Sequence, residues 1–177
     1  PNIGKESGLP GVTLKRVAQQ DYICPFVSPE GCTVYEDRPG ACRTYPLGRM
    51  VVRDRGEKRC NEAFFLIKEK HCLGFQESKE WTIEAWKENQ QLNTYNAMND
   101  LMMDVLASKN RSGKKRLTKE EAHVFSMACY DLDRFRDFVF QKDLLKTASL
   151  PAETKQAIQQ DDVALMRFAI AWLQQDL

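Results

Sequence analysis

The chain has 177 residues, of which 42% are hydrophobic and 29% are charged, so it can bury a core without depending on disulfides. Its 26 basic and 25 acidic residues leave a net charge of +1, which argues against nucleic acid as a partner. No apolar stretch is long enough to cross a bilayer, and the N-terminal residues lack the order of a signal peptide. We therefore expect a cytoplasmic protein with no membrane partner.

Composition divides the chain near residue 76, because five of the six cysteines and six of the seven prolines precede that point. We predict a cysteine-rich metal-binding lobe over residues 1–76 and a helical lobe over residues 77–177, packed together as one compact domain. In the first lobe, residues 33–35 and 50–52 predict brief strands. Residues 61–70 have a compact apolar pattern that predicts a short helix leading into Cys72.

The second lobe is predicted to consist of helices. Apolar positions at helical spacing predict one long helix from Thr82 to Val105, and a second helix is expected to run towards Cys129. The predicted fold class is therefore α-rich, with a helical bundle beside a small irregular lobe of strands and loops. Residues expected at helix starts, as caps or in the first turn, are Thr82, Thr118 in a capping box with Glu121, Asp133, Pro151 and Asp161.

Five cysteines of the first lobe are candidate metal ligands. Cysteines in a cytosolic chain are more often ligands or reactive groups than disulfides, since the cytosol keeps thiols reduced. No Cys-x-x-Cys pair, the usual knuckle of a zinc ribbon, is present, so spacing alone leaves a metal site and ordinary core thiols equally open. The spacings are 8, 10, 18 and 12 positions, between Cys24, Cys32, Cys42, Cys60 and Cys72.

Other candidate ligands have simpler interpretations. Cys129 lies in the middle of a predicted helix, where a core thiol is expected. His71 neighbours Cys72 and is an alternate ligand, but a surface position is the simpler expectation, and His71 with His123 does not make an independent zinc centre. The basic run over residues 109–116 is expected to be a solvated loop rather than a phosphate-binding patch.

The segment from Cys24 to Leu47 carries a dense motif, which continues with Cys60 and with Cys72-Leu73-Gly74. It resembles the YkgJ-like cysteine-cluster family of zinc- or iron-chelating proteins. That family usually begins with a Cys-x-x-Cys and a Cys-Cys pair, which residues 1–23 do not supply, so the chain as given completes one four-thiolate site. The matching positions are Cys24-Pro25, Gly31-Cys32, Tyr35, Arg38-Pro39 and Cys42-Arg43-Thr44-Tyr45-Pro46.

The resemblance implies a metal site, and we favour a 4Fe-4S cluster with Cys24, Cys32, Cys42, Cys60 and Cys72 as the ligand pool. Such a cluster carries net negative charge, so nearby donors and cations stabilise it. Arg38 and Arg43 are predicted to supply them. The alternative for both arginines is a surface ion pair with Glu36 or Asp37.

The leading interpretation is an iron–sulfur protein with a redox or cluster-assisted role and a redox or other protein partner. One alternative is a structural zinc protein whose helical lobe binds a partner. A second is a methyltransferase-like relative of the flagellin lysine methylases, which the resemblance includes, although the chain shows no separate cofactor motif. A third, disulfides in an exported protein, is disfavoured because no leader is seen. The residues assign no catalytic group, so enzymatic activity and oligomeric state stay open.

Overall fold

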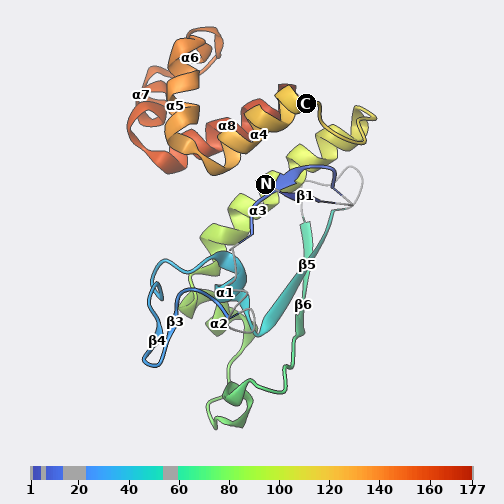
Figure 1. Cartoon of the computed structure of the whole chain (residues 1–177), viewed down its shortest axis with the longest axis vertical. Helices are drawn as coiled ribbons and strands as arrows, with labels where there is room; N and C mark the ends of the chain where they lie inside the picture. Colours follow the sequence, from blue (N-terminus) through green and yellow to red (C-terminus); the bar gives the residue numbers. More distant parts are fainter. Residues whose placement is uncertain (1, 5–6, 14–22, 54–59, 177) are drawn as a thin grey trace. The chain divides into compact units, whose positions relative to one another are not determined.

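The computed structural model describes residues 2–4, 7–13, 23–53 and 60–176 (Figure 1). The described part contains eight α-helices and three two-stranded antiparallel sheets, so the predicted α-rich fold class is confirmed. The chain forms two compact units: a helical unit of residues 1–24 and 98–177, and a cysteine-rich unit of residues 25–97. The division predicted at residue 76 on composition stays a prediction. In the described part, no helix is both long and apolar enough to span a membrane.

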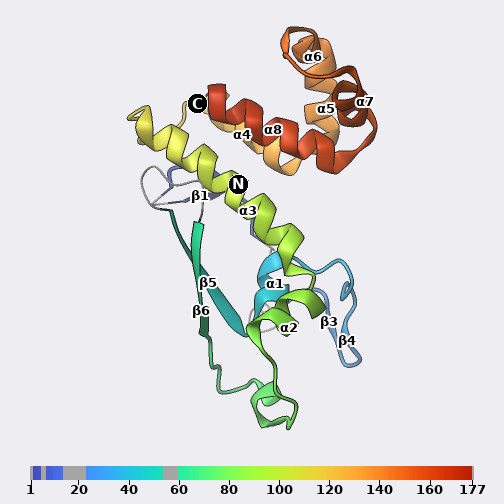
Figure 2. The same cartoon turned by 180° about the vertical axis from the view of Figure 1, so that it is seen from behind.

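The helical unit is a bundle whose chain returns on itself. The helices α4 and α8 lie side by side in both views, and α7 packs on α8 (Figures 1 and 2). A short pairing of β1 (Asn2–Ile3) with β2 (Pro10–Gly11) also belongs to this unit. Its helices are α3 (Leu92–Arg111, from residue 98 onward), α4 (Lys119–Tyr130), α5 (Leu132–Gln141), α6 (Leu144–Thr147), α7 (Ala152–Gln160) and α8 (Asp162–Asp176).

Helix starts in this unit follow the predicted capping chemistry, with shifts of one or two residues. The capping box of Thr118 and Glu121 is present at the start of α4, which confirms that prediction. At the start of α8, Asp161 Oδ1 accepts a hydrogen bond of 2.6 Å from the Ala164 amide. The cap of α5 is Asp131 rather than Asp133, because α5 begins immediately after α4 ends. Pro151 directly precedes α7 instead of lying in its first turn.

The prediction of one long helix from Thr82 to Val105 is wrong. The helix is interrupted at residues 90 and 91, which separate α2 (Ile83–Asn89) from α3. Thr82 does cap α2, since its Oγ1 accepts a 3.1 Å hydrogen bond from the Ala85 amide. Gln91 adopts a left-handed φ of 55°, which an α-helix of L-residues cannot continue through. Gln90 is buried and hydrogen-bonded by Arg38. Tertiary contacts at this break therefore outweigh the helical pattern of the sequence.

The cysteine-rich unit begins with short elements. The strand predicted at residues 33–35 is wrong, because those residues form turns after the small pairing of β3 (Val27–Ser28) with β4 (Gly31–Cys32). The helix α1 (Gly40–Thr44) follows, and the 3-10 helix η2 (Leu73–Gln76) lies further along. The predicted strand at 50–52 is confirmed within β5 (Leu47–Arg53), which pairs with β6 (Cys60–Leu66).

The helix predicted over residues 61–70 is also wrong, because residues 60–66 form β6. A short apolar run is compatible with either structure when only its own pattern is considered. In this protein, pairing with β5 makes the segment a strand rather than a helix. Gly48 faces Phe65 across the hairpin, and a Cβ at Gly48 would lie 2.2 Å from Phe65 Cζ. The ring therefore covers the glycine, an arrangement that fixes the register of this hairpin.

The core of the helical unit is built around Phe135, whose side chain is fully buried. Its ring centroid lies 6.2 Å from that of Phe138, 6.5 Å from that of Phe168 and 5.9 Å from that of Trp172. Aromatic contacts at these distances add to the gain from burial. The surrounding buried residues include Val105, Phe125, Ala128, Val139, Leu165, Ala169 and Leu173.

Replacing Phe135 with alanine is expected to lower the free energy of unfolding by about 3–5 kcal/mol, the usual cost of deleting a buried aromatic ring. Phe140→Ala is a matched control on the same helix, because Phe140 is 47% exposed, and it should cost about 0.5 kcal/mol or less. Urea unfolding followed by circular dichroism at 222 nm measures both values. Equal losses in the two variants would mean that the core is not centred on Phe135.

Candidate metal centre

The cysteine-rich unit has little hydrophobic core. Among its described residues, Leu92 is the one hydrophobic side chain that is buried, whereas Phe65 is 55% and Leu73 68% exposed. The other buried side chains are polar: Arg38, Arg43, Gln90 and Asn96. A unit that buries so little apolar surface cannot offset its conformational entropy by the hydrophobic effect alone.

Two buried arginines form the polar centre of this unit. Arg38 donates to the Tyr35 carbonyl and to Gln90 Oε1. Arg43 donates to the carbonyl of Arg38 through Nε at 2.9 Å, to the carbonyl of Gln90 at 3.4 Å, and to the carbonyl of Glu36. The two guanidinium groups therefore attach α1 and the loop before it to the end of α2.

Aromatic rings complete the surroundings of both guanidinium groups. Arg38 Cζ lies 3.7 Å from the centroid of the Tyr35 ring, and Arg43 Cζ lies 5.0 Å from that of Tyr95. Neither arginine forms an ion pair with a carboxylate in the part of the chain that the structure describes. Two positive charges are thus buried without a negative counter-charge, which is costly for the folded chain.

Helix α2 also holds the hairpin and α1. Trp86 Nε1 donates a 3.2 Å hydrogen bond to the Thr44 carbonyl at the end of α1. Glu62 on β6 pairs with Lys87 at 2.8 Å and with Arg49 at 2.9 Å. Hydrogen bonding from Lys87, together with Arg49, lowers the pKa of Glu62 despite its partial burial. These contacts attach α1 and the hairpin to α2.

Candidate ligand thiols are accessible where they are described. Cys24, Cys32 and Cys42 are exposed, and Cys72 is half-buried. Cys24 belongs to the helical unit, and the side chain of Cys60 lies outside the described residues. No three Cys, His, Asp or Glu side chains in the described ranges gather closely enough to hold a metal ion. The structure thus places three candidates, Cys32, Cys42 and Cys72, in one unit without bringing them together.

Tyr45 provides a specific feature beside one of these thiols. Its hydroxyl is buried and, among the described residues, has no hydrogen-bond partner of ordinary geometry. Interaction with the Cys72 thiol, together with burial, raises the pKa of Tyr45 to about 12. Gly74 is also close to this thiol, because a Cβ there would be in van der Waals contact with Cys72 Sγ at 3.7 Å. A buried O–H donor therefore lies next to Cys72.

A pocket of about 620 Å³ adjoins the Cys72 thiol and the Tyr45 ring. Much of its wall is aromatic, with Phe75, Trp81 and Trp86 among the lining residues. The rings of Trp81 and Trp86 meet edge to face with centroids 5.3 Å apart. The surroundings of Cys72 are therefore largely apolar, and an apolar shell limits water access to a metal site.

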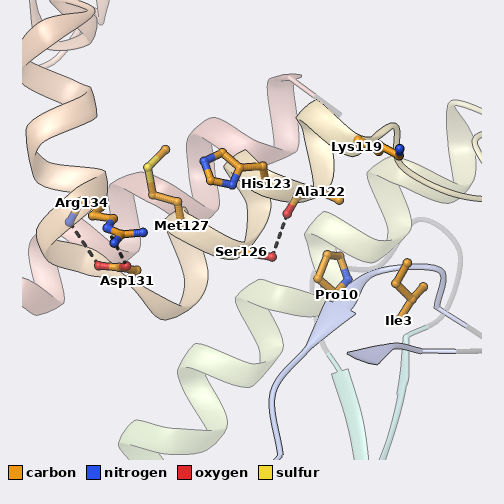
Figure 3. Close-up of a pocket in the computed structure, with 9 residues that line it drawn as sticks. All are labelled: Ile3, Pro10, Lys119, Ala122, His123, Ser126, Met127, Asp131 and Arg134. Carbon is orange, nitrogen blue, oxygen red and sulfur yellow. Dashed lines mark hydrogen bonds and ion pairs between the residues drawn. The ribbon is translucent and has the colours of Figure 1, made fainter. Parts of the chain in front are cut away.

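The remaining predicted candidates lie elsewhere. Cys129 is buried in α4, as expected for a core thiol, and burial raises its pKa to about 12. His71 is exposed and lies 3.6 Å from a carboxylate oxygen of Glu69. Figure 3 shows His123 at the wall of another pocket, of about 370 Å³, in the helical unit. In that pocket the carboxylate of Asp131 turns to Arg134, and no metal-ligand cluster forms among the described residues.

The thiol donors fit a metal that prefers soft ligands. Thiolates suit zinc and iron–sulfur clusters. The buried Tyr45 hydroxyl fits an acceptor sulfur at Cys72. The comparison with protein families agrees with this chemistry: the model named CxxCxxCC, described as "Putative zinc- or iron-chelating domain", matches residues 6–99, more than half of the chain.

The chain belongs to the CxxCxxCC family. The predicted family is thereby confirmed, and the match supports metal binding in general rather than one metal. The matched segment contains all five cysteines of the predicted ligand pool. Neither curated proteins nor solved structures gave a match.

Sequence reasoning missed two residues that organise this site. Tyr45 is part of the Cys-Arg-x-Tyr-Pro motif, so its place two residues after Arg43 was available as a signal. Gln90 carried no such signal, because its role comes from contacts with Arg38 and Arg43, about 50 positions earlier in the chain. The roles of Arg38 and Arg43 towards a cluster, and the ligand set itself, stay predictions.

Burial predicts how readily the thiols react in metal-free protein. At pH 8, iodoacetamide should modify Cys24, Cys32 and Cys42 at least about tenfold faster than Cys129, since only a minute fraction of a thiol with a raised pKa is thiolate. Peptide mass spectrometry gives the four rates. In urea the difference should disappear, which is the control. Fast native modification of Cys129 would show that α4 does not bury it.

Proposed function

We propose that the protein holds a 4Fe-4S cluster through four thiolates drawn from Cys24, Cys32, Cys42, Cys60 and Cys72, and that it has a redox or cluster-assisted role. When bound, such a cluster supplies one-electron transfer at a potential set by its surroundings. The proposal places the protein in the cytoplasm, where thiols stay reduced, with a redox partner of its own.

The observation that carries this proposal is the polar centre of the cysteine-rich unit. In its described part only Leu92 buries a hydrophobic side chain, yet four polar side chains are buried. A small unit of this kind usually needs a metal or disulfides to be stable. Free thiols are present instead of disulfides among the described cysteines. Metal binding would then contribute folding free energy, and it would hold the ligand thiols together.

The buried charges of the cysteine-rich unit support a negatively charged centre. Arg38 and Arg43 bring two buried positive charges without a carboxylate partner in the described part of the chain. Four thiolates around a cluster supply net negative charge, which would offset the cost of burying these cations. Their present hydrogen bonds go to carbonyl groups and Gln90, so we assign them a long-range electrostatic effect and a structural role rather than direct bonds to sulfur.

Iron–sulfur is favoured over zinc by a hydrogen-bond donor beside one candidate ligand. The buried Tyr45 hydroxyl next to Cys72 is a donor of the kind that tunes cluster potentials. Zinc remains the alternative that the following experiments separate.

Cys42→Ala is expected to lower bound metal and stability together, because the lost ligand removes binding energy that is also folding energy. Cys129→Ala is the matched control: it should keep the metal, since Cys129 is buried in the helical unit. Metal content per chain and absorbance near 400 nm, which an iron–sulfur cluster shows and zinc does not, are measured on anaerobically prepared protein. Equal metal loss from both variants would contradict the proposed ligand pool.

Tyr45→Phe is expected to keep the cluster but lower its reduction potential by tens of millivolts, where about 59 mV is tenfold for a one-electron couple. The reason is that an O–H donor stabilises the more negative, reduced state. Tyr35→Phe makes the same change at a tyrosine that is 54% exposed, and its potential should match the unaltered protein. An unchanged or higher potential in a fully loaded Tyr45→Phe variant would remove Tyr45 from the site.

A further inference from the structure

A second site of unusual charge lies in the helical unit, where the chain turns from α3 to α4. A pocket of about 520 Å³ is lined there by Gly8, Lys109, Gly113, Lys114, Lys115 and Arg116, among others. Four of these side chains are basic. The pocket is therefore positively charged, although the whole chain is close to neutral.

Lys109 is the unusual member of this group, because its side chain is only 2% exposed. Its ammonium donates to the Lys115 carbonyl at 3.2 Å, and no carboxylate of the described residues pairs with it. An ammonium group has three donors, so this bond leaves donor capacity unused. Lysine is almost never fully buried unless its charge is paired.

The N-terminal segment closes one side of the pocket. Gly8 has a φ of +64° and approaches so closely that a Cβ there would lie 2.2 Å from the Lys115 carbonyl oxygen and 3.2 Å from Lys109 Nζ. A side chain at position 8 would therefore displace the loop or the ammonium. The glycine lets the backbone cover Lys109 while the other basic residues face outward, where Lys115 and Arg116 are exposed.

One basic residue of the pocket already has a partner. Lys114 pairs with Glu121 at 2.6 Å. No ion pair is recorded for Lys109, Lys115 or Arg116 within the described part of the chain, so positive charge is in excess at this point. Oxygens of a phosphate group accept several charge-assisted hydrogen bonds from lysine and arginine at once. The volume lies in the range of small-molecule sites, which exceeds the need of a bare ion.

We propose that this pocket binds a small, soluble phosphate-bearing molecule, with the buried Lys109 ammonium and the exposed Lys115 and Arg116 as its cationic contacts. The site shares no residue with the proposed metal centre, and all of its lining residues belong to the helical unit. The sequence of residues 109–116 predicts a solvated loop. The buried side chain of Lys109 is the feature that this prediction did not include.

Calorimetric titration of the full-length protein with inorganic phosphate and with pyrophosphate, at constant ionic strength, tests the proposal. The protein should bind one equivalent saturably, and Lys109→Met should weaken binding at least about tenfold, because it removes the buried charge but keeps an unbranched side chain only one atom shorter. Lys142→Met, the same change at an exposed lysine of this unit, is the control and should bind as the unaltered protein does.

A double variant, Lys115→Gln with Arg116→Gln, keeps the test valid if Lys109→Met fails to fold, because both changed residues are exposed; it should also weaken binding. The proposal is overturned if neither probe binds saturably, if sodium chloride alone reproduces the heat, or if affinity is unchanged in every folded pocket variant. Sedimentation with vesicles containing phosphatidic acid, without binding of either soluble probe, would also overturn it.

Discussion

The cysteine-rich unit depends on the hydrogen bonds that join Arg38 and Arg43 to Gln90. These bonds connect α1 and the loop before it to Gln90, the residue that follows α2. Because the unit buries almost no hydrophobic side chain in its described part, the arginine contacts replace the apolar packing that usually fixes such a loop. They also impose a cost, since two positive charges are buried without a carboxylate partner in the described part of the chain.

A negatively charged thiolate centre would compensate for both the buried positive charges and the small buried apolar surface. It would offset the buried charge, and the energy of metal binding would hold segments that contribute little apolar surface. Tyr45 connects the two features along the chain, because it lies two residues after Arg43 while its hydroxyl lies beside Cys72. The helical unit has no such need. Its aromatic core around Phe135 is of the ordinary kind, which agrees with a helical unit that is stable without a metal.

Local chemistry in the sequence was sufficient for the helical fold and for several helix starts. The capping box at Thr118 and the cap at Asp161 follow from hydroxyl and carboxylate groups that act within three residues. Predictions failed where contacts with distant residues determine the secondary structure. Residues 61–66 form a strand whose Phe65 ring covers Gly48 of the partner strand. The helix after Thr82 breaks where Gln90 is held by Arg38. The motif around Cys42 identified the family, but no short-range pattern could show that Arg43 points inward while its neighbour Cys42 is exposed.

The central claim is that the thiols between Cys24 and Cys72 hold an iron–sulfur cluster. Iron, zinc and acid-labile sulfide, determined together on protein prepared without oxygen, test it most directly. The account predicts about four iron and four sulfide per chain, with little zinc. One zinc per chain without sulfide would contradict it and leave a structural zinc site in its place.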